Sequence, residues 1–120
     1  MNIVQEVAAT LGGQAIDLDK LADLVADQHP DLYVDRTRSA SRNWVREQLR
    51  KATDGDLPFA LSVDGHGTFR QLSFMDIDEF RFTIRQFMRQ SSKSRHRAYA
   101  LADECERLHG VRIDPVEAAA

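Results

Sequence analysis

The side chains best suited to binding a ligand gather on one predicted helix, at residues 37–52. At about 100° per residue, one side of this helix carries guanidinium, amide and hydroxyl groups, at Ser39, Arg42, Asn43, Arg46 and Arg50. Guanidinium forks match phosphate oxygens and the O6 and N7 atoms of guanine, and an Asn amide can bind adenine through two hydrogen bonds. The other side is apolar, at Ala40, Trp44, Val45, Leu49 and Ala52. We therefore expect one face to pack on a core and the other to face solvent or a ligand.

The charge of the chain is arranged in blocks. The chain has 120 residues and a formal net charge of −3. Residues 36–51 hold six Lys and Arg and one acid, and residues 81–97 hold six and no acid. Two concentrated basic bands produce local positive fields that the net charge does not report. The alternative is that both bands are solvated faces balanced by the acidic residues around them.

The elements that must position the basic helix can be read from the apolar spacing. Residues 3–11 predict a first helix, residues 14–16 a single extended rung, and residues 17–29 a second helix that begins at the N-cap Asp17. Residues 57–63 and 68–74 alternate like strands around the turn 64–67, which predicts a hairpin. Pairing Val63 with Thr68 places Phe59 opposite Leu72 and Leu57 opposite Phe74.

Helices are predicted again after the hairpin. Asp76 and Glu79 have the spacing of a capping box. The helix that they open breaks at residues 91–94 or continues through a kink, and a last helical segment ends near His109 and Gly110. Phe82 lies on the arginine side of the first of these helices, so it either packs under another segment or belongs to an interface. We expect residues 111–120 to be a frayed tail.

The residue types argue against several kinds of site. The single cysteine, Cys105, excludes an internal disulfide and a cysteine-rich zinc site, and its spacing with Leu101 and Leu108 predicts a core position. The four histidines lie in four different elements and lack ligand spacing. No nucleophile, base and orienting acid can be assembled from the sequence. We therefore expect no enzyme activity, no cofactor and no metal site.

This order of elements resembles a winged helix-turn-helix domain, over residues 1–74. The resemblance rests on the rung and helix from Ile16, the helix from Ser39 to Lys51, and the hairpin with residues 64–67 at its tip. It implies a mostly helical α+β fold with a small hairpin, followed by two further helices at 75–110. In that family the third helix enters the major groove and the hairpin, or wing, touches the DNA beside it. The implied DNA contacts are Arg36, Arg38, Ser39, Arg42, Asn43, Arg46, Arg50, Lys51, His66, Thr68 and Arg70.

The functional expectation is sequence-specific binding of double-stranded DNA, in transcription or replication control in a bacterium or phage. We expect a cytoplasmic protein without a membrane segment, because no apolar run is long enough to cross a bilayer and no signal sequence is visible. Helices after a wing often build dimers in this family. The expected homodimer contacts are Phe82, Arg85, Tyr99, Leu101 and Leu108.

Two other functions remain open at this point. The basic faces could bind an acidic partner protein, which would make the domain an interaction module or an inhibitor. Alternatively, the second basic band could bind RNA through its phosphates. The candidate residues for that contact are Arg85, Arg89, Lys93, Arg95 and Arg97.

Overall fold

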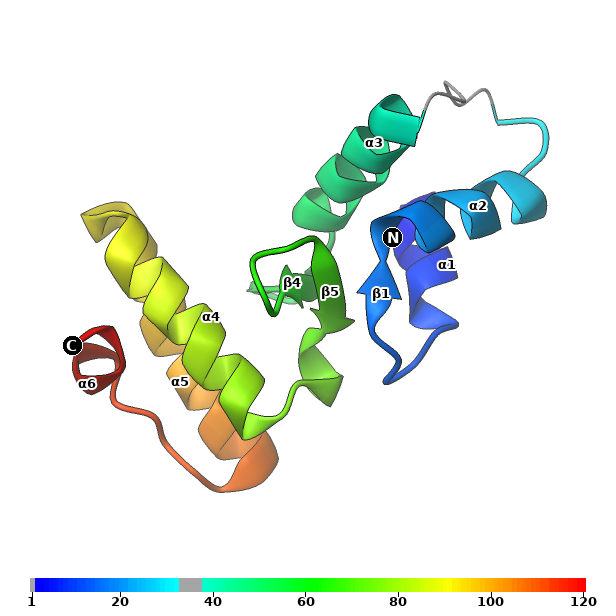
Figure 1. Cartoon of the computed structure of the whole chain (residues 1–120). Coiled ribbons are helices and arrows are strands. Elements are labelled where there is room, and N and C mark those ends of the chain that lie inside the picture. The colour runs from blue at the N-terminus through cyan, green and yellow to red at the C-terminus, as the bar shows by residue number, and fades with distance from the viewer. Residues whose placement is uncertain (1, 33–37) are drawn as a thin grey trace. The chain divides into compact units, whose positions relative to one another are not determined.

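The chain folds as two compact units, Met1–Leu72 and Ser73–Ala120, each built mainly from helices (Figure 1). The computed structural model describes residues 2–32 and 38–120. The first unit also contains a small antiparallel sheet of three strands. The predicted α+β class is confirmed.

Local capping sets the first two helices. In chain order the helices and strands of the first unit are α1 (Ile3–Ala9), β1 (Ile16–Asp17), α2 (Leu18–Gln28), α3 (Arg38–Lys51), β2 (Thr53–Asp54), β3 (Leu57–Pro58), β4 (Ala60–Ser62) and β5 (Thr68–Gln71). The side chain of Asp17 accepts hydrogen bonds from the amides of Asp19 and Lys20, as its predicted N-cap role requires. α2 ends before His29 and Pro30, also as predicted.

The three-stranded sheet has the order β1–β5–β4. Ile16 pairs with Phe69 on one side of β5, and Ser62 pairs with the same residue on the other side. The Val63 amide donates to the Thr68 carbonyl at 3.0 Å, and the Leu72 amide donates to the Phe59 carbonyl at 2.9 Å. These bonds confirm the predicted hairpin register between residues 59 and 72.

The predicted pairing of Leu57 with Phe74 was wrong. Leu57 pairs instead with Asp54, in a separate two-stranded ladder between β2 and β3. Gly55 has φ +66, which allows a tight turn between these strands. Leu72–Phe74 forms a 3-10 turn in place of the expected strand end.

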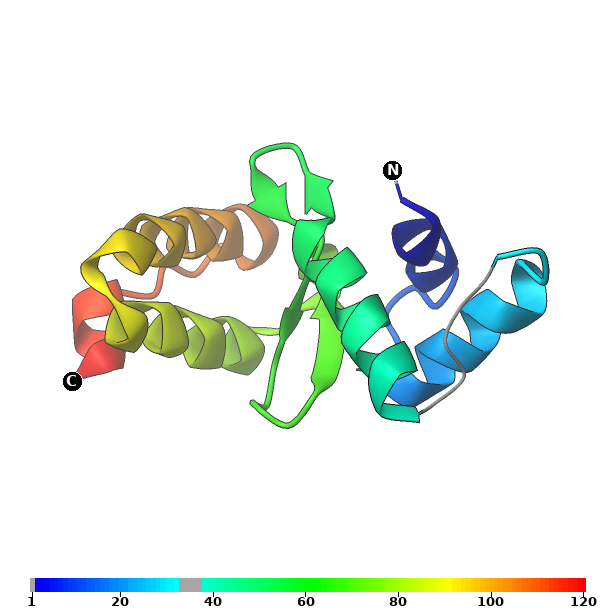
Figure 2. The same ribbon diagram turned by 90° about the horizontal axis from the view of Figure 1, so that it is seen from above.

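Apolar side chains from all three helices and the sheet form the core of the first unit. Ile16 and Leu21 are fully buried, together with Val45 and Leu49 of α3. α3 packs against α2 and runs beside β4 (Figure 2). Trp44 is partly buried and packs against this cluster, which confirms that it is a core anchor. Because Val45 and Leu49 face the core, the opposite side of α3 is turned outward.

The second unit is a helical bundle. Its elements are α4 (Ile77–Gln90), the 3-10 turn η2 (Ser92–Ser94), α5 (Arg95–His109) and α6 (Pro115–Ala119). The capping box between Asp76 and Glu79 is formed, and the break between α4 and α5 lies at the predicted serines. Phe80 and Ile84 of α4 are fully buried, as are Leu101 and Cys105 of α5.

The expectation of a frayed tail at residues 111–120 was wrong. Residues Pro115–Ala119 form α6, which packs against α4, and the Asp114 side chain caps it by accepting the Val116 amide at 3.0 Å. Ile113 and Ala118 are each only 7% exposed. Burial of these two side chains therefore holds a segment that is too short to be a stable helix alone.

Candidate nucleic-acid interface

Arg42, a predicted base-reading residue, is bound within the first unit. Its Nε and Nη2 atoms donate to the two carboxylate oxygens of Asp19 on α2, at 3.0 and 2.9 Å. The hydrogen bond to Asp19, reinforced by the charge of that carboxylate, raises the pKa of the guanidinium. On a helix at about 100° per residue, Arg42 lies about 20° from the buried Leu49. Arg42 therefore sits at the edge of the core-facing stripe, where α2 meets α3.

The outward face of α3 is formed by the other predicted residues. Asn43, Arg50 and Lys51 are exposed, and Arg46 is half-buried. We call these four residues the α3 face. The Arg46 Nη1 donates to the Asn43 side-chain oxygen at 3.3 Å, which places a guanidinium and an amide side by side. Such a pair places several hydrogen-bond donors within one helical turn.

One carboxylate lies within the α3 face. Glu47 accepts a hydrogen bond from Arg50 at 2.9 Å, and both side chains are more than half exposed. Glu47 was not among the predicted site residues, although its spacing of three residues from Arg50 is visible in the sequence. An exposed pair of this kind contributes little to stability, so Arg50 can exchange Glu47 for a phosphate. The face thus carries three cations and one acid.

Three of the expected contacts lie outside the part of the chain that is described. These are Arg36 and the side chains of Arg38 and Ser39.

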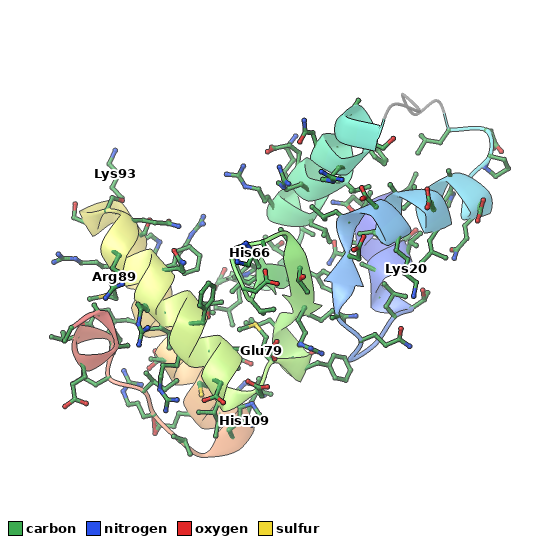
Figure 3. All side chains as sticks on the ribbon, viewed as in Figure 1. Lys20, His66, Glu79, Arg89, Lys93 and His109 are labelled. Atoms are coloured by element: carbon green, nitrogen blue, oxygen red, sulfur yellow. The ribbon has the colours of Figure 1, made fainter. Side chains whose placement is uncertain are left out.

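The hairpin tip is ordered by its own aspartate. Asp64 Oδ1 accepts the His66 amide at 2.7 Å and the Thr68 amide at 3.4 Å. The His66 amide is the main cause of a lowered pKa for the Asp64 carboxyl group. Gly65 and Gly67, with φ +74 and +91, allow the tight turn. His66 is exposed at the tip (Figure 3). Thr68, at the start of β5, is half-buried.

Arg70 has a structural contact that the sequence did not predict. It lies on β5 opposite Leu61, and its Nη1 donates to the Gly13 carbonyl. Gly13 belongs to the connection between α1 and β1, so Arg70 fastens that connection to the sheet. The tip therefore brings together His66 and Thr68, whereas Arg70 is held further along the strand.

The predicted dimer surface is largely taken up by the second unit itself. Leu101 is fully buried, so its assignment to an interface was wrong. Arg85 Nε donates to the Ala118 carbonyl of α6 at 2.8 Å. Arg85 and Arg89 follow Phe82 along one side of α4, and both donate to carbonyls of α6. α6 thus lies on the side of α4 that carries Phe82, and this half-buried side chain fits the expected alternative of packing under another segment.

Of the other interface candidates, Leu108 is half-buried and Tyr99 is 43% exposed.

The buried thiol and the metal-ligating residue types are two other kinds of chemical group in the described chain. Cys105 is fully buried, and burial raises the pKa of its thiol, which opposes formation of a reactive thiolate. Among residues 2–32 and 38–120, no group of three or more His, Cys, Asp or Glu is placed to hold a metal ion. Over the same residues, no helix has the length and apolar character that spanning a membrane requires.

Comparisons of the whole chain with family models, with curated proteins and with solved structures find no match.

Proposed function

We propose that residues 1–72 form a winged helix-turn-helix domain that binds double-stranded DNA, as a regulator of transcription or replication. The order helix, strand, helix, helix and then a hairpin supports this proposal. So does the sheet order β1–β5–β4, in which the strand between the first two helices joins the hairpin. In this arrangement α3 is the recognition helix and residues 60–71 form the wing.

The observation that carries the proposal is the α3 face. Asn43 and Arg50 are exposed on the solvent side of α3, and the half-buried Arg46 lies between that side and the core-facing Val45 and Leu49, which are 0% and 1% exposed. The buried side fixes the helix in the unit, so the donors on the outer side are held on a rigid scaffold. Guanidinium and amide groups are the commonest readers of guanine and adenine in the major groove.

The ion pair of Arg42 gives this residue a different role from the one expected. Because its Nε and Nη2 atoms donate to Asp19, a base contact through that edge of the guanidinium would require the loss of two hydrogen bonds. We assign Arg42 to positioning α3 against α2, and we assign base reading to Asn43 and Arg46. Arg50, Lys51 and the hairpin tip contact phosphates.

Fluorescence anisotropy with a labelled duplex tests the proposal. A binding site is first selected from random duplexes, and the Asn43→Ala and Arg46→Ala variants are then compared with the unmodified chain. Each lost base contact should weaken binding by about 1–3 kcal/mol and relax the sequence preference. Lys20→Ala is the matched control, since it removes one cation from α2 in the same unit (Figure 3).

Two results would contradict the proposal. Unchanged affinity and preference in both α3 variants would remove α3 as the reading helix. No binding of any duplex at about 50 mM salt would exclude DNA as the ligand and would favour an acidic protein partner.

A further inference from the structure

The second unit contains a long segment without acidic residues. Between Phe80 and Ala102 the sequence has six Lys and Arg and no Asp or Glu. This segment covers most of α4, the turn η2 and the first half of α5. The positive charge of the segment is therefore not balanced by acids within it.

Several of these cations are already engaged within the second unit. Arg81 pairs with Asp78 at 2.9 Å, and Arg85 and Arg89 donate to carbonyls of α6. Arg97 lies over the Phe87 ring, with its Cζ atom 5.9 Å from the centroid.

Lys93, Arg95 and His96 remain exposed. None of the three has an ion pair or a side-chain hydrogen bond within residues 2–32 and 38–120. We call these three residues the connection patch, because they lie where α4 gives way to α5. Lys93 points away from the helices at this end of the unit, and Arg89 projects from the side of α4 (Figure 3).

The position of the connection patch is unfavourable for the fold. α5 begins at Arg95, its N-cap Ser94 makes no side-chain capping bond, and its first turn contains no acid. The positive end of the helix dipole therefore faces Lys93 and Arg95, an arrangement that disfavours the helix. Stabilisation of α5 does not account for these cations, whereas binding of an anion at this end would.

The neighbours of the patch indicate which kind of anion fits. Ser91 and Ser92 are exposed hydroxyl donors, and Tyr99 follows Arg95 by one helical turn with 43% of its surface exposed. Phosphate contacts of nucleic-acid-binding proteins use these residue types, together with Lys, Arg and helix N-termini. The centre of a protein interface needs buried apolar anchors instead. Among the described residues of 85–99, Tyr99 is the one large apolar side chain that is exposed, and its hydroxyl can also donate to a phosphate.

We propose that the connection patch is a second, sequence-independent contact to the phosphates of duplex DNA. The choice of duplex DNA as the ligand rests on the proposed function. Under this proposal the first unit selects the sequence, and the second unit adds affinity that depends on salt but not on sequence.

The salt dependence of binding tests this inference with the full chain. Anisotropy is recorded for a random-sequence duplex at a series of salt concentrations, and log K is plotted against log salt. The Lys93→Gln/Arg95→Gln variant removes two phosphate contacts, so its slope should be shallower by about 1.8. Arg107→Gln/Arg112→Gln is the control for net charge, because both of these cations pair with carboxylates of the second unit. Its slope should match that of the unmodified chain.

Thermal unfolding of the same variant separates binding from a structural role. Because Lys93 and Arg95 oppose the dipole of α5, their replacement should leave the second unit at least as stable. A clear loss of stability would assign both residues a structural role and overturn the inference.

The remaining outcomes separate this inference from the proposed function. Equal slopes for the patch variant and the unmodified chain overturn the inference alone. A reduced slope, together with unaltered sequence preference in the Asn43 and Arg46 variants, supports the patch and contradicts the role of α3. If the patch variant loses affinity for single-stranded RNA and keeps its slope with duplex, the choice of duplex DNA is wrong.

Discussion

Gln71 connects the sheet to the first helix, and its replacement gives a sharp test of the fold that positions the α3 face. This side chain is 6% exposed, and its Nε2 donates to the carbonyls of Ala8 and Gly12, each at 3.1 Å. Both carbonyls lie where α1 gives way to the connection that leads to β1. Gln71→Met keeps the length and much of the volume of the side chain but removes both donors.

The expected cost follows from what each carbonyl loses. The Ala8 carbonyl keeps the Leu11 amide as a donor at 3.0 Å, so it loses only its second partner. The Gly12 carbonyl is partly buried and loses the bond from Gln71. A net hydrogen bond contributes about 0.5–1.5 kcal/mol, and an unsatisfied carbonyl adds to the cost. We expect Gln71→Met to lower the free energy of unfolding of the first unit by about 1–3 kcal/mol.

Urea unfolding followed by tryptophan fluorescence measures this change. Trp44 is the only tryptophan in the chain and packs against the core of the first unit, so its emission reports on that unit. Gln14→Met is the control, because Gln14 is exposed in the same connection. Surface substitutions of this kind change the free energy of unfolding by less than about 0.5 kcal/mol. A Gln71→Met variant as stable as the control would refute the role given to these two hydrogen bonds.

Two further predictions concern the second unit and the hairpin tip. Leu101→Ala should destabilise the second unit by about 2–5 kcal/mol, since it leaves a cavity at a fully buried site. Urea unfolding followed by circular dichroism measures this change. An unchanged unfolding midpoint would contradict the buried position of Leu101. The Asp64 carboxyl group should titrate below its ordinary pKa of 3.8, because the His66 amide stabilises the charged form. The charged carboxylate of Asp64 stabilises the turn fully above the ordinary pKa, and this stabilisation is lost as the pH falls through the lowered pKa of the folded state. Carboxyl chemical shifts in an acid titration measure the pKa, and a value at or above the ordinary one would contradict the contact.

Local features of the sequence predicted much of the fold. The N-caps at Asp17 and Asp76 are local interactions, and both are formed. The hairpin register was also predictable, because the turn at residues 64–67 and the alternation beside it specify one pairing. Helical periodicity alone separated Asn43 and Arg50 from the buried Val45 and Leu49.

Long-range contacts account for what the sequence did not show. The pair of Asp19 with Arg42 depends on how α2 meets α3, and no local pattern reports that packing. α6 could have been anticipated from Asp114 and Pro115, since an N-cap followed by Pro is a helix start signal. Its packing on α4 was not visible in the sequence.

The most direct test of the central proposal is a nuclear magnetic resonance titration of the labelled full chain with duplex DNA at low salt. If α3 and the hairpin bind DNA, the largest shift changes in the first unit should fall on the amides of residues 43–51 and 64–68. Arg46 and Arg50 should lead these changes, whereas α1 should stay largely unaffected. Spectra that do not change with duplex, or changes confined to α1 and the outer side of α2, would contradict the proposal.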